Sequence, residues 1–120
     1  MERKAIGNRA EDAVARHLEA RGFDVRFRNL RLGYLEIDLV ATKDDLCVMV
    51  EVRSRGKNAY EKPLASLTST KKKMYLLNAA DRLWRRYVSK TNMRLRIDVA
   101  GVTFDGNTTL IDYVEGALTR

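Results

Sequence analysis

The chain lacks several features on which whole classes of protein depend. It contains one cysteine, Cys47, which excludes an intramolecular disulfide, and one histidine, so that a Cys/His zinc cluster is excluded as well. One proline and seven glycines argue against a collagen-like or disordered chain. No apolar run approaches the roughly 18 residues of a membrane span, and no signal-peptide apolar region follows Met1. We therefore expect no membrane segment, and a reducing cytoplasm as the compartment.

Acidic residues are fewer than basic ones, and the imbalance is confined to one segment. The chain carries 23 Lys and Arg against 16 Asp and Glu, a net charge of +7. Residues 71–96 hold nine basic residues and one acid, Asp81, which gives this segment a charge of +8 and the rest of the chain −1. This pattern predicts a polyanionic partner, with nucleic acid before an anionic membrane surface; general solubility is the plainer explanation.

The residue pattern predicts one mixed α/β domain over residues 1–120, with the element order α-β-β-β-α-β-β. An apolar stripe at helical spacing predicts a helix over 3–21 that ends at Gly22. A second stripe predicts a helix that begins at the N-cap candidates of 68–70 and ends near Val88. The predicted strands are 23–29, 34–42, 46–53, 93–104 and 108–113, with the last two joined by a turn at 105–107.

Two of these strands are apolar at nearly every position. The runs 34–42 and 46–53 therefore predict a hairpin that is buried on both faces of a sheet. In contrast, strand 23–29 alternates, and strict alternation places Phe23, Val25 and Phe27 on one face.

Acidic side chains interrupt this buried hairpin. Glu36 and Asp38 lie in its first strand, and Glu51 and Arg53 in its second. A two-residue turn at 44–45 places Asp38 opposite Glu51 and Glu36 opposite Arg53, with Cβ atoms about 5 Å apart. Two carboxylates that close repel unless a cation or a proton lies between them, which predicts a Mg²⁺ or Mn²⁺ site. A structural ion-pair cluster, in which Glu36 pairs with Arg53, is an equal alternative.

Other charged residues extend this pattern. Glu11 lies at the edge of the first helix's buried stripe, where it can reach the sheet; a carboxylate favoured by the helix dipole is the plainer interpretation. Three lysines at the start of the second helix oppose its dipole, which suggests phosphate contacts; a solvated charge run is an equal alternative. The residues expected to bind nucleic acid are Lys71, Lys72, Lys73, Arg85, Arg86 and Arg96.

Taken together, these residues resemble the small bacterial YraN-like proteins, which are related to archaeal Holliday-junction resolvases and to the PD-(D/E)XK nuclease superfamily. The matching stretches cover most of the chain and follow the family order. They are Gly7 to Ala13 with Glu11, the run Glu36-Ile37-Asp38-Leu39-Val40-Ala41, Val50-Glu51-Val52-Arg53-x-Arg55, Lys71, and Arg96-Ile97-Asp98-Val99.

The resemblance implies a restriction-endonuclease-like fold, in which helices flank a mixed sheet, and metal-dependent hydrolysis of DNA phosphodiesters. It assigns Asp38, Glu51 and the Val52 carbonyl as ligands of Mg²⁺ or Mn²⁺, with Glu11 as an outer acid and Glu36 as a supporting residue. Arg53 takes the place of the superfamily's catalytic lysine. Because arginine stays protonated, its role is reduced to stabilising charge, a role that Lys71 can share.

Two functions therefore remain open. One is a Mg²⁺-dependent nuclease that cleaves DNA, including branched or structured DNA. The other is a non-catalytic nucleic-acid-binding module that keeps a nuclease fold, suggested by Arg53 and by Leu35, where the family usually has glycine. Because junction-cleaving relatives act as dimers, a homodimer is an expected assembly.

Overall fold

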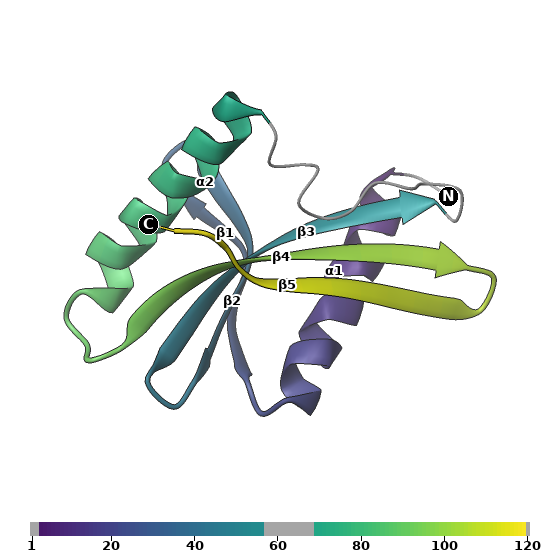
Figure 1. The fold of residues 1–120 in the computed structure, drawn as a ribbon, viewed down its shortest axis with the longest axis horizontal. Helices are drawn as coiled ribbons and strands as arrows, with labels where there is room; N and C mark the ends of the chain where they lie inside the picture. The colour runs from purple at the N-terminus through teal and green to yellow at the C-terminus, as the bar shows by residue number, and fades with distance from the viewer. Residues whose placement is uncertain (1–2, 57–68, 120) are drawn as a thin grey trace.

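The structure, a computed structural model, describes residues 3–56 and 69–119 and shows a mixed α/β fold (Figure 1). Its elements follow the predicted order, and a short π-helical turn, η2, continues helix α2. Their bounds are α1 (Arg3–Ala20), β1 (Asp24–Leu32), β2 (Leu35–Lys43), β3 (Leu46–Gly56), α2 (Thr70–Leu83), η2 (Trp84–Val88), β4 (Arg94–Asp105) and β5 (Thr108–Leu118). Within the described residues, no helix is both long enough and apolar enough to cross a membrane.

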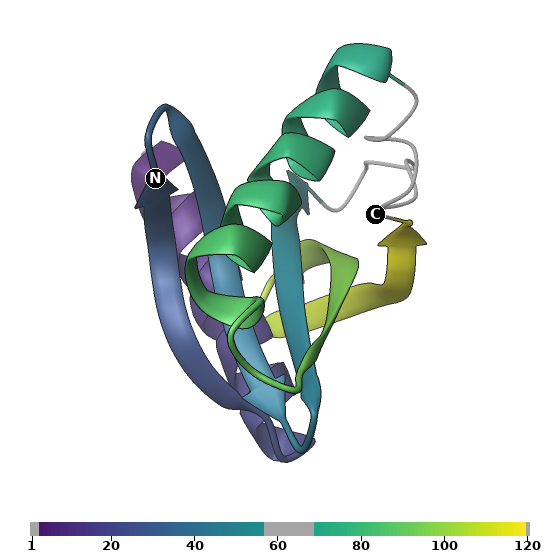
Figure 2. The same cartoon turned by 90° about the vertical axis from the view of Figure 1, so that its left-hand side faces the viewer.

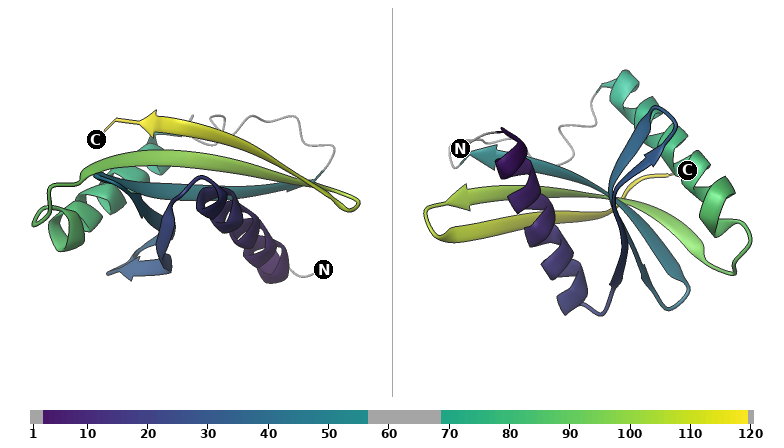
Figure 3. Two further views of the ribbon diagram at one scale, coloured as in Figure 1. Left: turned by 90° about the horizontal axis from the view of Figure 1, so that it is seen from below. Right: turned by 180° about the vertical axis from the view of Figure 1, so that it is seen from behind.

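The strands form a five-stranded sheet in the order β1-β2-β3-β4-β5. The pair β3 and β4 is parallel, whereas the other neighbouring pairs are antiparallel. A parallel pair needs a crossover connection, and α2 lies within that connection. The sheet twists strongly, so that β1 and β2 fan away from β4 and β5 (Figures 1 and 3).

Helices α1 and α2 lie on opposite faces of this sheet (Figures 2 and 3). Under α1, Leu18 packs in one buried cluster with Val48, and under α2, Leu83 packs in a second cluster with Met49. Adjacent residues of β3 thus face different helices. The prediction that the central strands are buried on both faces is confirmed.

Local signals set the helix ends. Gly22 has a φ of +89°, a conformation that favours glycine, and its N–H donates to the Glu19 carbonyl at 3.0 Å. The helix ends at Ala20, one residue before the predicted end, with Gly22 as the predicted stop. Ser69 is the N-cap of α2, and its hydroxyl accepts a hydrogen bond from the Lys72 N–H at 3.4 Å. Thr68, another predicted cap candidate, lies outside the described residues.

The predicted alternation of the first strand is wrong at Phe27. Phe23 and Val25 pack on the α1 side of the sheet, whereas Phe27 packs on the α2 side. The pairing of β1 with β2 shifts between Val25 and Phe27, so a β-bulge turns the strand over at that point. The strand then continues to Leu32 rather than ending at Asn29.

The last strand also runs further than predicted, to Leu118 rather than Tyr113. Its register against β4 shifts on either side of Asp98, where Gly116 has a φ of +58°. The main-chain N–H of Gly116 donates to the Asp98 carboxylate at 2.9 Å. Because this bond joins two strands, the pattern of the last strand alone does not predict its continuation.

Candidate active site

The β2–β3 hairpin has the register that a two-residue turn predicts. The turn is formed by residues 44–45, and the pairing runs from Lys43–Leu46 to Leu39–Val50. Every pair within this stretch agrees with the prediction. The two strands are thereby aligned so that their acidic residues follow the last pair at the same level.

The regular pairing stops one step before these acids. Asp38 and Glu51 are the next residues of the two strands, but they do not form a ladder pair. Instead, the main-chain N–H of Val52 donates to Asp38 Oδ2 at 2.8 Å. The predicted direct opposition is thus replaced by an arrangement in which the Asp38 side chain bridges the gap between the separating strands.

Strand β2 turns over at Asp38. Ile37 packs under α2 and Leu39 under α1, although a strict two-residue period places both side chains on one face. Asn29, which lies across from Asp38 on strand β1, has a φ of +52°. Because both strands change faces at the same level, the Asp38 side chain lies toward β3 rather than under either helix.

This position is electrostatically unfavourable for an ionised carboxylate. Burial, the Glu51 carboxylate and the Glu11 carboxylate raise the pKa of Asp38 to about 7. The Val52 N–H and the Lys72 ammonium act in the opposite direction on that pKa but are outweighed. Asp38 is therefore a group whose charge a nearby cation would stabilise.

Two cations lie against Glu51, which is itself only 8% exposed. Lys72 Nζ is 3.1 Å from Glu51 Oε1, and an Arg53 guanidinium nitrogen is 3.5 Å from the same oxygen. The sequence pattern predicts Lys72 on a phosphate-binding surface, but in the structure its ammonium lies against the Glu51 carboxylate. The signal was present in the helical pattern, because Lys72 precedes the buried Leu76 by four residues and so lies on the same face of α2.

Glu36 and Arg53, predicted to face each other, have separate partners. The Glu36 carboxylate lies 3.5 Å from Arg31, and its main-chain N–H donates to the hydroxyl of Tyr75 on α2 at 2.9 Å. Arg53 Nε is buried without a hydrogen-bond partner among the described residues. The predicted Glu36–Arg53 pair is therefore wrong, although Glu51 does lie in an ion-pair cluster, with Arg53 and Lys72. The main chain at Glu36 links β2 to α2, and the role of the Glu36 carboxylate stays a prediction.

Helix α1 carries Glu11 to the same level of the sheet. Its side chain is buried, and its Oε1 has no hydrogen-bond partner among the described residues. Burial raises the pKa of Glu11, while the Arg28 guanidinium and a hydrogen bond with the Asn29 side chain act to lower it. The structure thus brings Glu11 and Asp38 together, as the edge position of Glu11 on its helix allows.

These side chains form a partial donor set for a metal ion. Among the described residues, no three His, Cys, Asp or Glu side chains are gathered to hold one. Mg²⁺, however, is commonly held by one or two carboxylates, with water and substrate phosphate completing its coordination. A divalent cation would reduce the repulsion between the Asp38 and Glu51 carboxylates. It would also provide an interaction for the unpartnered oxygen of Glu11. The residues fit Mg²⁺ or Mn²⁺.

The remaining basic residues divide between two places. Lys71 and Lys73 are exposed in the first turn of α2. Arg85 and Arg86 are exposed in η2, and Arg85 pairs with Asp81 at 3.1 Å. These four side chains are accessible to a nucleic acid, and their role stays a prediction.

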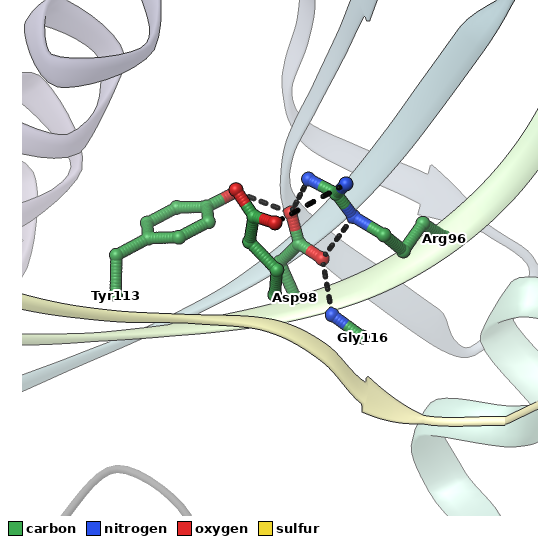
Figure 4. A network of polar contacts seen from close by, with 5 residues as sticks. Arg96, Asp98, Tyr113 and Gly116 are labelled. Atoms are coloured by element: carbon green, nitrogen blue, oxygen red, sulfur yellow. Dashed lines mark hydrogen bonds and ion pairs between the residues drawn. The ribbon is translucent and has the colours of Figure 1, made fainter.

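Arg96 belongs to a different arrangement (Figure 4). Its guanidinium donates to both oxygens of Asp98, at 2.8 and 2.9 Å, and Asp98 is fully buried. The Tyr113 hydroxyl and the Gly116 N–H donate to the same carboxylate at 2.6 and 2.9 Å. Arg96 is thus held in the sheet by a structural network, and we leave it out of the nucleic-acid surface proposed below.

The raised pKa of Asp38 predicts how its effect on stability depends on pH. The unfolded state ionises near the ordinary pKa of 3.8, whereas the folded state retains the proton to about pH 7. The contribution of Asp38 to stability is therefore full below pH 4 and is lost as the pH rises through 7. Without metal, we expect the Tm of wild type to fall relative to the Tm of Asp38→Asn as the pH rises from 5 to 8. Calorimetric scans in chelator check this, and a constant difference contradicts it.

Comparison with known proteins identifies relatives across nearly the whole chain. The model of a family described as "Uncharacterised protein family UPF0102" matches residues 10–102. A UPF0102 protein of Sorangium cellulosum is 43% identical over 104 residues, which cover 85% of this chain and 72% of the relative. One from Myxococcus xanthus is 35% identical over 97% of this chain and 90% of its own length. One from Pelotomaculum thermopropionicum is 38% identical over 96% of both chains.

Proposed function

Because this chain belongs to the uncharacterised protein family UPF0102, as its YraN-like sequence predicts, we propose its function from the geometry of its own site. We infer that the protein is a metal-dependent endonuclease that hydrolyses phosphodiester bonds in DNA, including branched or otherwise structured DNA. One observation carries this proposal. Asp38 and Glu51 lie where β2 and β3 separate, the Val52 N–H holds Asp38, and the Lys72 ammonium lies 3.1 Å from Glu51.

The architecture supports the same class of protein. A mixed sheet with one helix on each face, and acids at the point where two central strands diverge, is consistent with a restriction-endonuclease-like fold. We propose this finer fold class together with the relationship to PD-(D/E)XK nucleases. The paired acids on β2 and β3 and the basic residue two positions after Glu51 occur in the order of that motif.

The carboxylates of Asp38 and Glu51, with the Val52 carbonyl, are the groups that we propose to hold Mg²⁺ or Mn²⁺. When bound there, the cation lowers the pKa of a water molecule and neutralises charge on the scissile phosphate. The protein's part is to hold two acids whose charges interact in a partly buried place. The Val52 N–H fixes the orientation of Asp38, so that one carboxylate oxygen is already engaged and the other is directed by it.

We propose that Lys72 takes the role of the superfamily's catalytic lysine, whose position in the sequence is occupied by Arg53. An arginine does not release its proton near neutral pH, whereas a lysine can both stabilise a phosphate charge and exchange a proton. The Lys72 ammonium approaches Glu51 from α2, on the same oxygen that the Arg53 guanidinium approaches from β3. We propose that Lys72 stabilises the developing charge on the phosphate and that Arg53 orients Glu51.

Glu11 completes the site from the α1 side. Burial raises its pKa, and its unpartnered Oε1 has hydrogen-bonding capacity that no described residue uses. We propose that this oxygen binds a water molecule in the second layer of the site. Glu11 would then act as an outer acid that positions water rather than as a direct metal ligand.

The helix that carries Lys72 also begins the proposed DNA surface. Lys71 and Lys73 are exposed beside it at the N-terminus of α2, where the free main-chain amides add hydrogen-bond donors for phosphate. A strand whose backbone contacts these residues passes next to Glu51, because Lys72 lies between them in sequence and contacts that acid. This arrangement links binding and cleavage to a single helix turn.

A panel of DNA substrates tests the proposed function. Supercoiled, linear, single-stranded and four-way-junction DNA are incubated with purified protein and Mg²⁺ or Mn²⁺, with chelator as the control. We expect cleavage of at least one structured substrate that the chelator abolishes. Clear binding with no cleavage of any substrate would instead establish the non-catalytic module, for which Arg53 in place of lysine is the main argument.

Binding to DNA is expected to weaken steeply with salt. Each phosphate that a lysine or arginine neutralises releases condensed counterions, so about four contacts reduce affinity on the order of a hundredfold between 50 and 200 mM salt. Fluorescence anisotropy with a labelled duplex, in chelator to prevent cleavage, measures the slope. An affinity that hardly changes over this range contradicts a phosphate-binding surface, and a Lys71→Gln, Lys73→Gln variant should lower the slope by about two.

Two further features complete the proposal. The Cys47 thiol is buried, and burial raises its pKa to about 11, so it is a packing group compatible with the reducing cytoplasm in which we place the enzyme.

We also propose that a homodimer acts on structured DNA, because two strands at one position require two sites. Analytical ultracentrifugation with and without junction DNA tests this assembly.

A further inference from the structure

A basic cavity lies apart from the carboxylates, between the β1–β2 turn and the C-terminal end of α2. It has a volume of about 580 Å³, and the described residues that line it include four arginines, which are Arg31, Arg82, Arg85 and Arg86. No described lining residue is acidic. The sequence predicts that Arg85 and Arg86 bind nucleic acid, and the structure places them opposite the β1–β2 turn, which supplies the other wall.

The Arg82 side chain lies against a glycine of the β1–β2 turn. Gly33 has a φ of +68°, and a Cβ placed there would lie 2.5 Å from Arg82 Nη1. The same Arg82 nitrogen donates to the Leu32 carbonyl at 3.4 Å. The Arg82 guanidinium thus contacts the turn and forms one wall of the cavity.

Aromatic rings lie beside these arginines. Tyr34, next to Gly33 in the turn, has the Arg82 guanidinium carbon 5.2 Å from its ring centroid and is 71% exposed. Tyr87 lines the cavity, has the Arg86 guanidinium carbon 5.8 Å from its ring centroid, and is partly exposed. An exposed ring stabilised by an arginine is a surface on which a further flat group can stack.

The cavity lies near the start of β2, the strand that carries Asp38, and its described lining residues belong to β1, the β1–β2 turn, α2 and η2. Tyr34 precedes Asp38 by four residues, which is about 13 Å along β2 at the usual rise of a strand. Between them, the ion pair of Arg31 with Glu36 joins the cavity wall to the strand. A DNA strand of a few nucleotides can therefore reach both places.

We propose that this cavity binds unpaired nucleotides of a single-stranded DNA segment next to the scissile bond. The arginines bind the phosphates, and the base stacks on Tyr34. The choice of a single strand follows from the chemistry, because the faces of duplex bases are stacked on one another and only an unpaired base can stack on a protein ring. This inference rests on the proposed nuclease function and names its substrate class: DNA with a single-stranded arm, such as a flap or a fork.

Equilibrium binding in chelator tests the cavity independently of cleavage. Two labelled DNAs are compared by fluorescence anisotropy, a blunt duplex and the same duplex with a six-nucleotide single-stranded arm. We expect Tyr34→Ala to weaken binding of the armed DNA on the order of tenfold and to leave the blunt duplex within about twofold. Tyr34→Phe, which keeps the ring, should restore binding of the armed DNA.

The matched control is Leu110→Ala, which truncates another exposed apolar side chain, on β5, and should alter neither affinity. Circular dichroism verifies that each variant is folded. Equal losses for both DNAs would show a general electrostatic surface and overturn the proposal, as would an unchanged affinity of Tyr34→Ala for the armed DNA. An armed RNA–DNA duplex bound more tightly than armed DNA would overturn the choice of DNA.

The outcomes for the cavity and for the nuclease are distinguishable. If Tyr34→Ala binds both DNAs normally while wild type cleaves with Mg²⁺, the cavity proposal fails and the nuclease stands. If Tyr34→Ala loses the armed DNA but wild type cleaves no substrate, the protein is a binding module with this cavity as its single-strand site.

Discussion

Asp38→Asn will abolish Mg²⁺-dependent cleavage of DNA, with a loss of at least roughly a thousandfold in rate, while DNA binding in chelator stays within about twofold. The asparagine keeps an oxygen that can accept the Val52 N–H bond, so the separated strands retain their geometry. It removes the negative charge that, with Glu51, is proposed to hold the divalent cation. The loss therefore falls on catalysis and not on the basic surface, which lies on α2.

The hairpin provides a matched control for this experiment. Asp45 lies at the turn that joins β2 and β3, is exposed, and pairs with Arg94 at 3.3 Å. Asp45→Asn makes the same chemical change on the same hairpin, away from the strand separation, and should leave cleavage unchanged. Glu51→Gln should reproduce the loss seen with Asp38→Asn. Cleavage that survives in Asp38→Asn would contradict the proposed site, even if nuclease activity is present.

The same variant separates function from stability. Because burial and Glu51 raise the pKa of Asp38 to about 7, ionisation of this acid costs stability in the metal-free protein. At pH 8 in chelator, we expect Asp38→Asn to be more stable than wild type by roughly 2 kcal/mol, or about 5–10 °C in Tm. A variant that is more stable but inactive would indicate that Asp38 serves catalysis at a cost in stability.

The register of the hairpin could be predicted from the sequence, but the arrangement at its end could not. A two-residue turn fixes the pairing of strands through local geometry, and the observed pairs from Lys43–Leu46 to Leu39–Val50 agree. The change of face at Asp38 depends on a neighbouring strand, where Asn29 adopts a positive φ. No pattern within residues 34–42 contains that information.

The roles of the basic residues show a similar division. Lys72 could have been placed toward the sheet, because it falls on the helical stripe that includes Leu76, but its charge favoured a surface assignment. Arg96 and Asp98 are two residues apart on one strand and so share a face, which made their ion pair visible in principle. The burial of that pair could not be predicted from the strand itself, because the burial of Asp98 depends on Tyr113 and Gly116 of the next strand.

Asp98→Ala is expected to cause the largest loss of stability, about 3–5 kcal/mol, or a Tm lower by roughly 10–20 °C. The carboxylate is fully buried and accepts two hydrogen bonds from Arg96, one from Tyr113 and one from the Gly116 N–H (Figure 4). Its removal leaves the partly buried Arg96 guanidinium with only the exposed Glu115 carboxylate, 3.6 Å away, and two inward-facing donors without an acceptor. Urea denaturation followed by circular dichroism measures the change in the free energy of unfolding.

Graded variants keep this prediction testable if Asp98→Ala does not fold. Tyr113→Phe removes one donor and should cost about 1–2 kcal/mol, because the carboxylate retains its bonds with Arg96 and Gly116. Arg96→Met should cost more than Tyr113→Phe, since it leaves a buried negative charge without its cation. The control is Arg94→Met, on the same strand, whose exposed pair with Asp45 should hardly affect the Tm. Equal small effects for Arg94 and Arg96 would show that burial does not strengthen this network.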